Sequence, residues 1–94
     1  MDYMTTAYQA LKASHLVKSE RDFSTRYLKR SASFVSSWKS RDRDWPLTSL
    51  MTLAARLNET SKLLEQSKYG RDTATELSRL SRDIGQHIYE QSLV

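Results

Sequence analysis

The sequence contains no cysteine, one proline and only two glycines in 94 residues. Without cysteine the chain has no disulfide, no thiol nucleophile and no cysteine-based metal site. The scarcity of glycine and proline disfavours a β-rich fold with many turns, so the composition favours an all-α protein. No apolar run approaches the roughly 18–20 residues of a membrane-spanning helix, and the N-terminus lacks the basic start and apolar stretch of a secretory signal. We therefore expect a cytoplasmic protein with no membrane partner.

Bulky apolar side chains are nevertheless numerous enough for one hydrophobic core. Hydrophobic residues make up 38% of the chain and include twelve leucines, two tryptophans, five tyrosines and two phenylalanines. This content excludes full disorder, but two independent cores would each be too small to fold unaided. We expect one helical domain over residues 1–68 and an additional C-terminal helix within residues 71–94.

The excess positive charge is concentrated in one segment. The formal net charge is +4, and residues 18–43 contain eight basic and three acidic side chains, whereas the rest of the chain carries a slight excess of acid. A localised basic surface is typical of proteins that bind a polyanion. An ordinary solvated surface, basic for solubility, is the alternative, and charge alone does not decide between them.

Two helices are predicted near the N-terminus. Tyr3, Ala7 and Leu11 recur at intervals of four residues, which indicates the buried stripe of a first helix. Ser19 is followed three residues later by the acid Asp22, a spacing that predicts a capping box at the start of a second helix.

A third, short helix is expected soon after the second. We expect the second helix to end near residues 29–30 and Ser31 to be the N-cap of a helix over residues 32–40. Val35 and Trp38 are three residues apart and would bury one side of that helix, which leaves its other side exposed.

A leucine-rich helix follows Pro46, because proline suits the first turn of a helix. We expect this helix to extend toward Lys68, with Gly70 as its C-terminal stop. Its apolar side chains repeat at helical spacing and comprise Leu50, Leu53, Ala54 and Leu57.

The last helix is predicted to begin at a second capping box, over residues 73–76. Its narrow apolar stripe is typical of a helix–helix seam and comprises Leu77, Leu80, Ile84 and Ile88. We expect this stripe to form a homodimer interface or to pack on the chain's own bundle against Leu63 and Leu64. Gly85 interrupts the helix either as a tolerated weak point or to admit another backbone.

Residues 19–57 follow the order of a known DNA-binding domain: a capped helix, a turn, a short helix, a charged loop and a leucine-rich helix. The stretch resembles the helix-turn-helix domain of the Cro and lambda-repressor type over roughly residues 5–60. Phe23 and Ser24 match the apolar and small residues of the first motif helix. Residues 31–38 read Ser-Ala-Ser-Phe-Val-Ser-Ser-Trp, similar to the family's Ser-Pro-Ser-Tyr-Ile-Ser-Arg-Trp, and residues 50–57 match its Leu-x-x-Leu-Ala-x-x-Leu.

The resemblance implies a lambda-repressor-like bundle of about five helices that reads double-stranded DNA through the major groove. The helix at residues 31–41 would lie in the groove, and flanking cations and helix N-termini would bind phosphates. Such proteins commonly act as dimeric transcriptional regulators, so we expect a repressor-like regulator. The implied DNA-binding residues are Ser19, Arg26, Lys29, Arg30, Ser31, Ser33, Ser36, Ser37, Lys39, Ser40, Arg41 and Arg43.

The sequence also departs from the family pattern. Glu20 stands where the family usually has a phosphate-binding glutamine, and Lys29 stands where the turn usually begins with glycine. The expected reading face carries serines, which discriminate poorly between base edges. These departures favour an alternative function, a protein-interaction module such as an antiactivator or adaptor built on the same fold, whose partner would be another protein.

We expect no enzymatic activity, cofactor or metal site. His15 and His87 have no carboxylates at metal-ligand spacing, and the HxxxH, GxGxxG and P-loop signatures are missing from the sequence. Asp42 and Asp44 lie in a basic loop, where solvation explains them better than a catalytic pair does.

Overall fold

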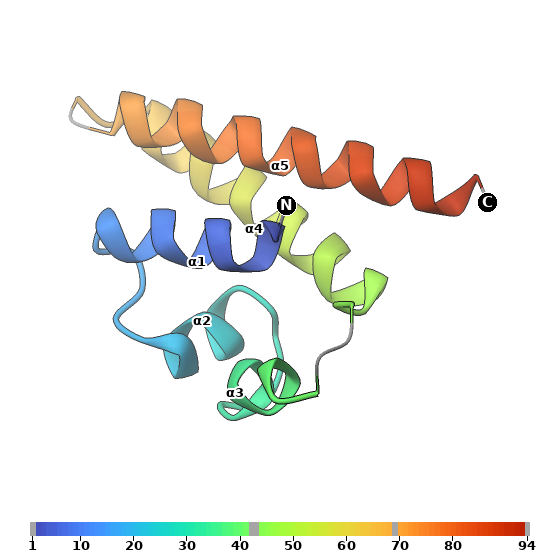
Figure 1. Ribbon diagram of the computed structural model, residues 1–94. Coiled ribbons are helices and arrows are strands. Elements are labelled where there is room, and N and C mark those ends of the chain that lie inside the picture. Colours follow the sequence, from blue (N-terminus) through green and yellow to red (C-terminus); the bar gives the residue numbers. More distant parts are fainter. Residues whose placement is uncertain (1, 42–43, 69, 94) are drawn as a thin grey trace.

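The computed structural model describes residues 2–41, 44–68 and 70–93, which form five α-helices and no strand. The helices α4 and α5 are long and run antiparallel along each other, α1 packs against α5, and α2 and α3 lie at the opposite side of α1 (Figure 1). The expected all-α class is therefore confirmed. In chain order the helices are α1 (Tyr3–Ala13), α2 (Glu20–Arg26), α3 (Phe34–Lys39), α4 (Leu47–Glu65) and α5 (Arg71–Ser92).

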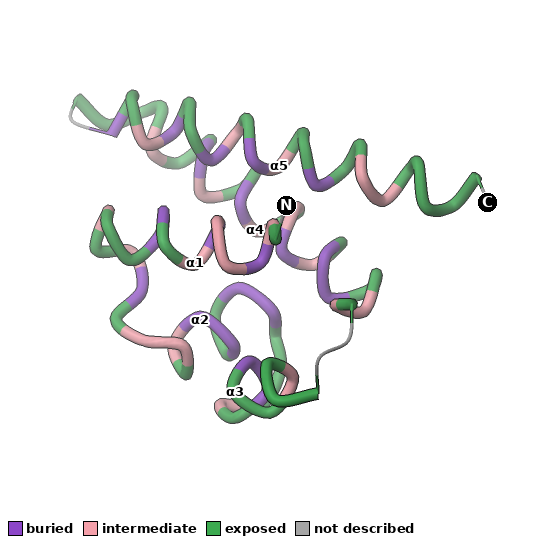
Figure 2. Tube along the Cα trace, viewed as in Figure 1, coloured by how far each residue is buried: buried purple, intermediate pink, exposed green. Residues whose placement is uncertain are grey.

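All five helices contribute to a single hydrophobic core, which Figure 2 shows as the buried parts of each helix turned toward one another. Leu11 of α1, Phe23 of α2, Leu53 of α4 and Leu77 of α5 are fully buried in it. The radius of gyration is 13.0 Å, close to the about 13 Å of a compact domain of about 100 residues. The C-terminal helix is thus an integral part of the bundle.

The starts of α1 and α2 are fixed by side-chain caps. The Asp2 carboxylate accepts the backbone N–H groups of Met4 and Thr5. The Ser19 hydroxyl accepts the N–H of Asp22 at 3.3 Å, as the capping box predicts. The return bond differs from the usual pattern, since the Asp22 carboxylate accepts the N–H of Lys18 at 2.9 Å instead of that of the cap residue.

The expected boundaries between the second and third helices are wrong. α2 ends at Arg26, before the predicted residues 29–30, and α3 begins at Phe34 with Ser33 as its N-cap in place of Ser31. Lys29 has a φ of 53°, a left-handed conformation that no α-helix contains, so α2 stops before it. The N–H of Phe34 bonds the Ser31 carbonyl at 3.0 Å, which shows that residues 31–34 form a turn ahead of α3.

The expected roles of Gly70 and of residues 73–76 are also wrong. α4 ends at Glu65, and Gly70 is the N-cap of α5, so residues 73–76 lie inside that helix. A Cβ atom on Gly70 would stand 2.9 Å from the Leu64 carbonyl oxygen. The glycine is therefore required by the close approach of the α4 and α5 ends, a contact that sequence spacing does not reveal.

The apolar stripe of α5 packs on the chain's own bundle. Leu77, Leu80 and Ile84 are buried and Ile88 is half-buried in the shared core, so in this fold they are not available as the expected dimer seam. Leu64 packs against the core as expected, whereas Leu63 is 70% exposed.

Serine hydroxyls join the two long helices through backbone carbonyls. Ser61 of α4 donates to the Ala74 carbonyl at 2.7 Å, and Ser81 of α5 donates to the Ala54 carbonyl at 2.8 Å. Beyond its own turn of α5, a Cβ atom at Gly85 would meet no atom of the described residues within 4 Å. The expectation that this glycine admits another backbone therefore has no support within the chain itself.

Candidate nucleic-acid interface

The turn between α2 and α3 depends on one residue in a left-handed conformation. Lys29 has a φ of 53°, a region that favours glycine over other L-residues. The next N–H, that of Arg30, bonds the Ser24 carbonyl at 3.0 Å. Leu28, the residue before the turn, is 1% exposed and inserts into the core. The turn therefore fixes α3 against α2 through both a buried side chain and a backbone bond.

Ser24 is the residue that connects the two helices directly. It is fully buried, and its hydroxyl donates to the Glu20 carbonyl at 2.9 Å. The same oxygen accepts the N–H of Val35 at 3.2 Å. That N–H belongs to the first turn of α3, whose own N-cap Ser33 makes no side-chain capping bond. Ser24 thus caps α3 from the neighbouring helix, which a larger side chain at this position would prevent.

The outer face of α3 carries serines, as expected. The residues Ser33, Ser36, Ser37 and Ser40 are all exposed, and Ser31 is exposed in the preceding turn. The Ser36 hydroxyl donates to the Ser33 carbonyl at 3.1 Å, and the Ser40 hydroxyl donates to the Ser37 carbonyl at 2.7 Å. A hydroxyl has a single proton, so in this conformation both groups present acceptor lone pairs to a ligand.

Two of the expected phosphate-binding cations are paired with acids of the same chain. Lys39 at the end of α3 forms an ion pair with Glu20 at the start of α2, and this bond raises the pKa of the Lys39 ammonium. Arg26 lies 3.7 Å from the Asp22 carboxylate and also donates to the Leu16 carbonyl at 3.4 Å. Both cations are exposed while their carboxylate partners are half-buried, so each pair is partly screened by solvent and the cation is open to exchange with another anion.

The two arginines that flank α3 are held by aromatic rings. The Arg30 guanidinium lies 4.5 Å from the centroid of the Phe34 ring, and that of Arg41 lies 5.5 Å from the centroid of the Trp38 ring. The two rings stack on each other at a centroid distance of 5.8 Å. Cation–π contact restrains each guanidinium without neutralising its charge. No ion pair among the described residues involves Arg30, Arg41 or the exposed Lys29.

The remaining expected residues have different positions. Ser19 is half-buried and its hydroxyl is occupied by the cap of α2. Arg43 lies outside the described residues. Sequence reasoning missed Arg21, which lines a shallow cavity of about 430 Å³ with Ala32, Ser33 and Ser36. Arg21 was visible only as part of the basic segment, because its proximity to the start of α3 depends on how the two helices cross.

In the described part of the chain, no helix is long and apolar enough to cross a membrane. Nor do the described His, Asp and Glu residues form a group of three or more that could hold a metal ion.

No curated protein and no solved structure matches this chain. One family model matches residues 4–93. This range contains α2 to α5 in full and all of α1 except Tyr3. The chain therefore belongs to the Family of unknown function (DUF6626).

Proposed function

We propose that this chain is a small helix-turn-helix transcriptional regulator that binds double-stranded DNA, with the segment 31–41 in the major groove. The observation that carries the proposal is the connection between α2 and α3. Its left-handed residue, Lys29, stands where the Cro and lambda-repressor pattern has glycine, and Ser24 bonds the start of α3 at the position of the family's small residue. A short, rigidly supported helix with one exposed face suits insertion into a major groove.

The charge around α3 supports the same function. Arg30 precedes the helix and Arg41 follows it, and each guanidinium is held against an aromatic ring while remaining free of acids among the described residues. Two restrained cations at opposite ends of the inserted helix would contact the two phosphate backbones beside the groove. Lys39 and Arg26 would add further phosphate contacts only after exchanging their carboxylate partners.

A charge-reversal experiment tests this assignment. We expect Arg30→Glu together with Arg41→Glu to abolish binding of a labelled duplex, measured by fluorescence anisotropy at about 0.15 M salt, near physiological ionic strength. The matched control is Arg79→Glu with Arg82→Glu, which changes the net charge equally at two exposed positions of α5. Equal affinity of the two double variants would contradict the proposed face.

Sequence preference is tested separately, by selecting bound duplexes from a random pool with the full-length chain. Recovery of an inverted repeat is the expected result for a dimeric regulator, and its half-site spacing would give the distance between the two copies of α3. A homodimer would need a surface other than the buried stripe of α5, so sedimentation of the free chain should accompany the selection.

The alternative proposal is a protein-interaction module on the same fold. It is favoured by Glu20, whose carboxylate binds Lys39 beside α3, and by the serines of the exposed face, which discriminate poorly between bases. A module of this kind would bind every duplex weakly and enrich no site from the pool. A DNA reader would instead show a steep salt dependence together with a preferred site.

A further inference from the structure

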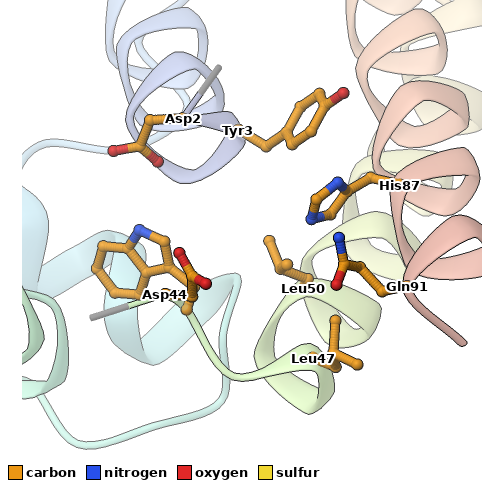
Figure 3. Close-up of a pocket in the computed structure, with 8 residues that line it drawn as sticks. Asp2, Tyr3, Asp44, Leu47, Leu50, His87 and Gln91 are labelled. Carbon is orange, nitrogen blue, oxygen red and sulfur yellow. The ribbon is translucent and has the colours of Figure 1, made fainter. Parts of the chain in front are cut away.

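A cleft of about 670 Å³ lies where the start of α1, the start of α4 and the end of α5 meet (Figure 3). It is formed by the start of α1, the segment before α4 and the last turns of α5. Its volume falls within the range of small-molecule sites, roughly 300–1,000 Å³. The polar and aromatic residues around it are Asp2, Tyr3, Asp44, Trp45, His87 and Gln91.

The charge of this cleft is opposite to that of the chain as a whole. Among the described residues that line it, Asp2 and Asp44 are acids and none is lysine or arginine, although the chain carries a net charge of +4. The Asp2 carboxylate accepts a hydrogen bond from the Thr5 hydroxyl at 2.6 Å in addition to the two backbone N–H groups that it caps. Burial acts to raise the pKa of Asp2, but these hydrogen bonds outweigh it and lower the pKa.

Several polar side chains around the cleft make no hydrogen bond or ion pair with the described part of the chain. Among the described residues, no hydrogen bond or ion pair involves the side chains of Asp44, His87 or Gln91. Figure 3 shows Asp44 and His87 directed toward the open space from opposite sides. Asp44 and Gln91 are exposed, so their side chains are open to a ligand in the cleft.

The rest of the lining is apolar and aromatic. Leu47 and Leu50 of α4 form one side, and the indole of Trp45 and the ring of Tyr3 form others. The Tyr3 ring contacts the His87 imidazole at a centroid distance of 5.2 Å, which holds the start of α1 against α5. Aromatic faces next to carboxylates attract a cation and exclude an anion.

From this combination we propose that the cleft binds a small organic cation, a protonated amine carried on an apolar or aromatic body. The ammonium group lies against the Asp44 carboxylate, and the body packs on Leu47, Leu50 and Trp45. Asp2 adds negative charge at the edge of the cleft, but its carboxylate already accepts the hydrogen bonds of the α1 cap. The Gln91 amide and the His87 imidazole border the site. This site shares no residue with the proposed DNA-binding face, so amine binding and DNA binding can be tested independently of each other.

The test is a titration of the ¹⁵N-labelled, tag-free chain, followed by two-dimensional NMR with three probes of one shape. 2-Phenylethylamine is the cation, 2-phenylethanol the neutral analogue and phenylacetate the anion. We expect saturable shifts with the amine at residues 2–3, 44–50 and 87–91, and binding at least about tenfold weaker for the other two, the size of one charge-assisted hydrogen bond.

Matched variants separate binding from folding. Asp44→Asn should weaken amine binding about tenfold, whereas Asp83→Asn, at an exposed position of α5 that does not line the cleft, should leave it unchanged. Gln91→Glu adds a carboxylate at the border and should strengthen binding. The proposal is overturned if the amine gives no saturable shift at about 10 mM, a weak affinity for any site. It is equally overturned if all three probes bind alike or if Asp44→Asn binds as tightly as the unaltered chain.

Discussion

Replacement of Ser24 by alanine tests the idea that α2 supplies the cap of α3. The hydroxyl is fully buried, and without it the N–H of Val35 loses its acceptor inside the core. A buried donor left without a partner costs about 1–3 kcal/mol. Alanine has a higher helix propensity than serine, so the substitution also stabilises α2 by roughly 0.5 kcal/mol. We therefore expect Ser24→Ala to lower the free energy of unfolding by about 1–2 kcal/mol, with a fall in Tm of at least about 4 °C for a domain of this size.

Urea unfolding followed by far-UV circular dichroism measures this change, and Ser49→Ala provides the control. Ser49 is also a buried serine, but among the described residues its hydroxyl has no hydrogen-bond partner. Removing that hydroxyl should leave stability unchanged or raise it slightly, because no bond is lost. If Ser24→Ala and Ser49→Ala unfold at the same urea concentration, the hydroxyl of Ser24 does not cap α3 and the reasoning fails.

Three further predictions concern the helix ends and the glycines. Gly85→Ala should raise the free energy of unfolding by about 1 kcal/mol in urea titrations, since the site is inside a helix and the new Cβ meets no described atom; a loss would mean that a second chain packs there. Gly70→Ala should lower the Tm in thermal scans, because the Cβ would stand 2.9 Å from the Leu64 carbonyl oxygen, and an unchanged Tm would show that the α4–α5 turn shifts freely. Asp2 has a lowered pKa in the folded chain, so its carboxylate stabilises the fold above its unfolded pKa of about 3.9, and this stability is lost as the pH falls further. Asp2→Ala should therefore be less stable than the unaltered chain at pH 6, and the two free energies of unfolding should converge near pH 2.5. A difference that stays constant over that pH range would show that Asp2 does not titrate in this way.

The parts of the fold that local spacing controls were predictable from the sequence. The stripe of Ala7 and Leu11, the cap at Ser19 and the leucines of α4 depend on neighbours within one or two turns, and the structure confirms them. The wrong helix boundaries occur where contacts with residues distant in the sequence determine where a helix begins or ends. α3 begins at Phe34 because the Ser24 hydroxyl of α2 accepts a hydrogen bond from its first turn. Gly70 is needed because a Cβ atom there would lie 2.9 Å from the Leu64 carbonyl oxygen of α4.

The same division applies to the candidate site. The sequence identified the basic segment and the exposed serines of α3, since both follow from composition and helical period. It did not identify the Lys39–Glu20 pair or the stacking of Arg30 on Phe34, because these contacts join residues through the crossing of α2 and α3 and through the geometry of the turn. Charge counting therefore overestimates the number of cations that are free to bind phosphate.

The indoles of Trp38 and Trp45 lie within 6.3 Å of each other, centroid to centroid, and the first donates its N–H to the Asp44 carbonyl at 3.1 Å. They are the only two tryptophans in the sequence. Tryptophan fluorescence of this protein consequently reports on a single corner, the junction of α3 with α4, whereas circular dichroism is dominated by the 19 and 22 residues of α4 and α5. The two signals observe different halves of the molecule, so their coincidence during unfolding would show directly that the corner and the long helical pair melt as one cooperative unit.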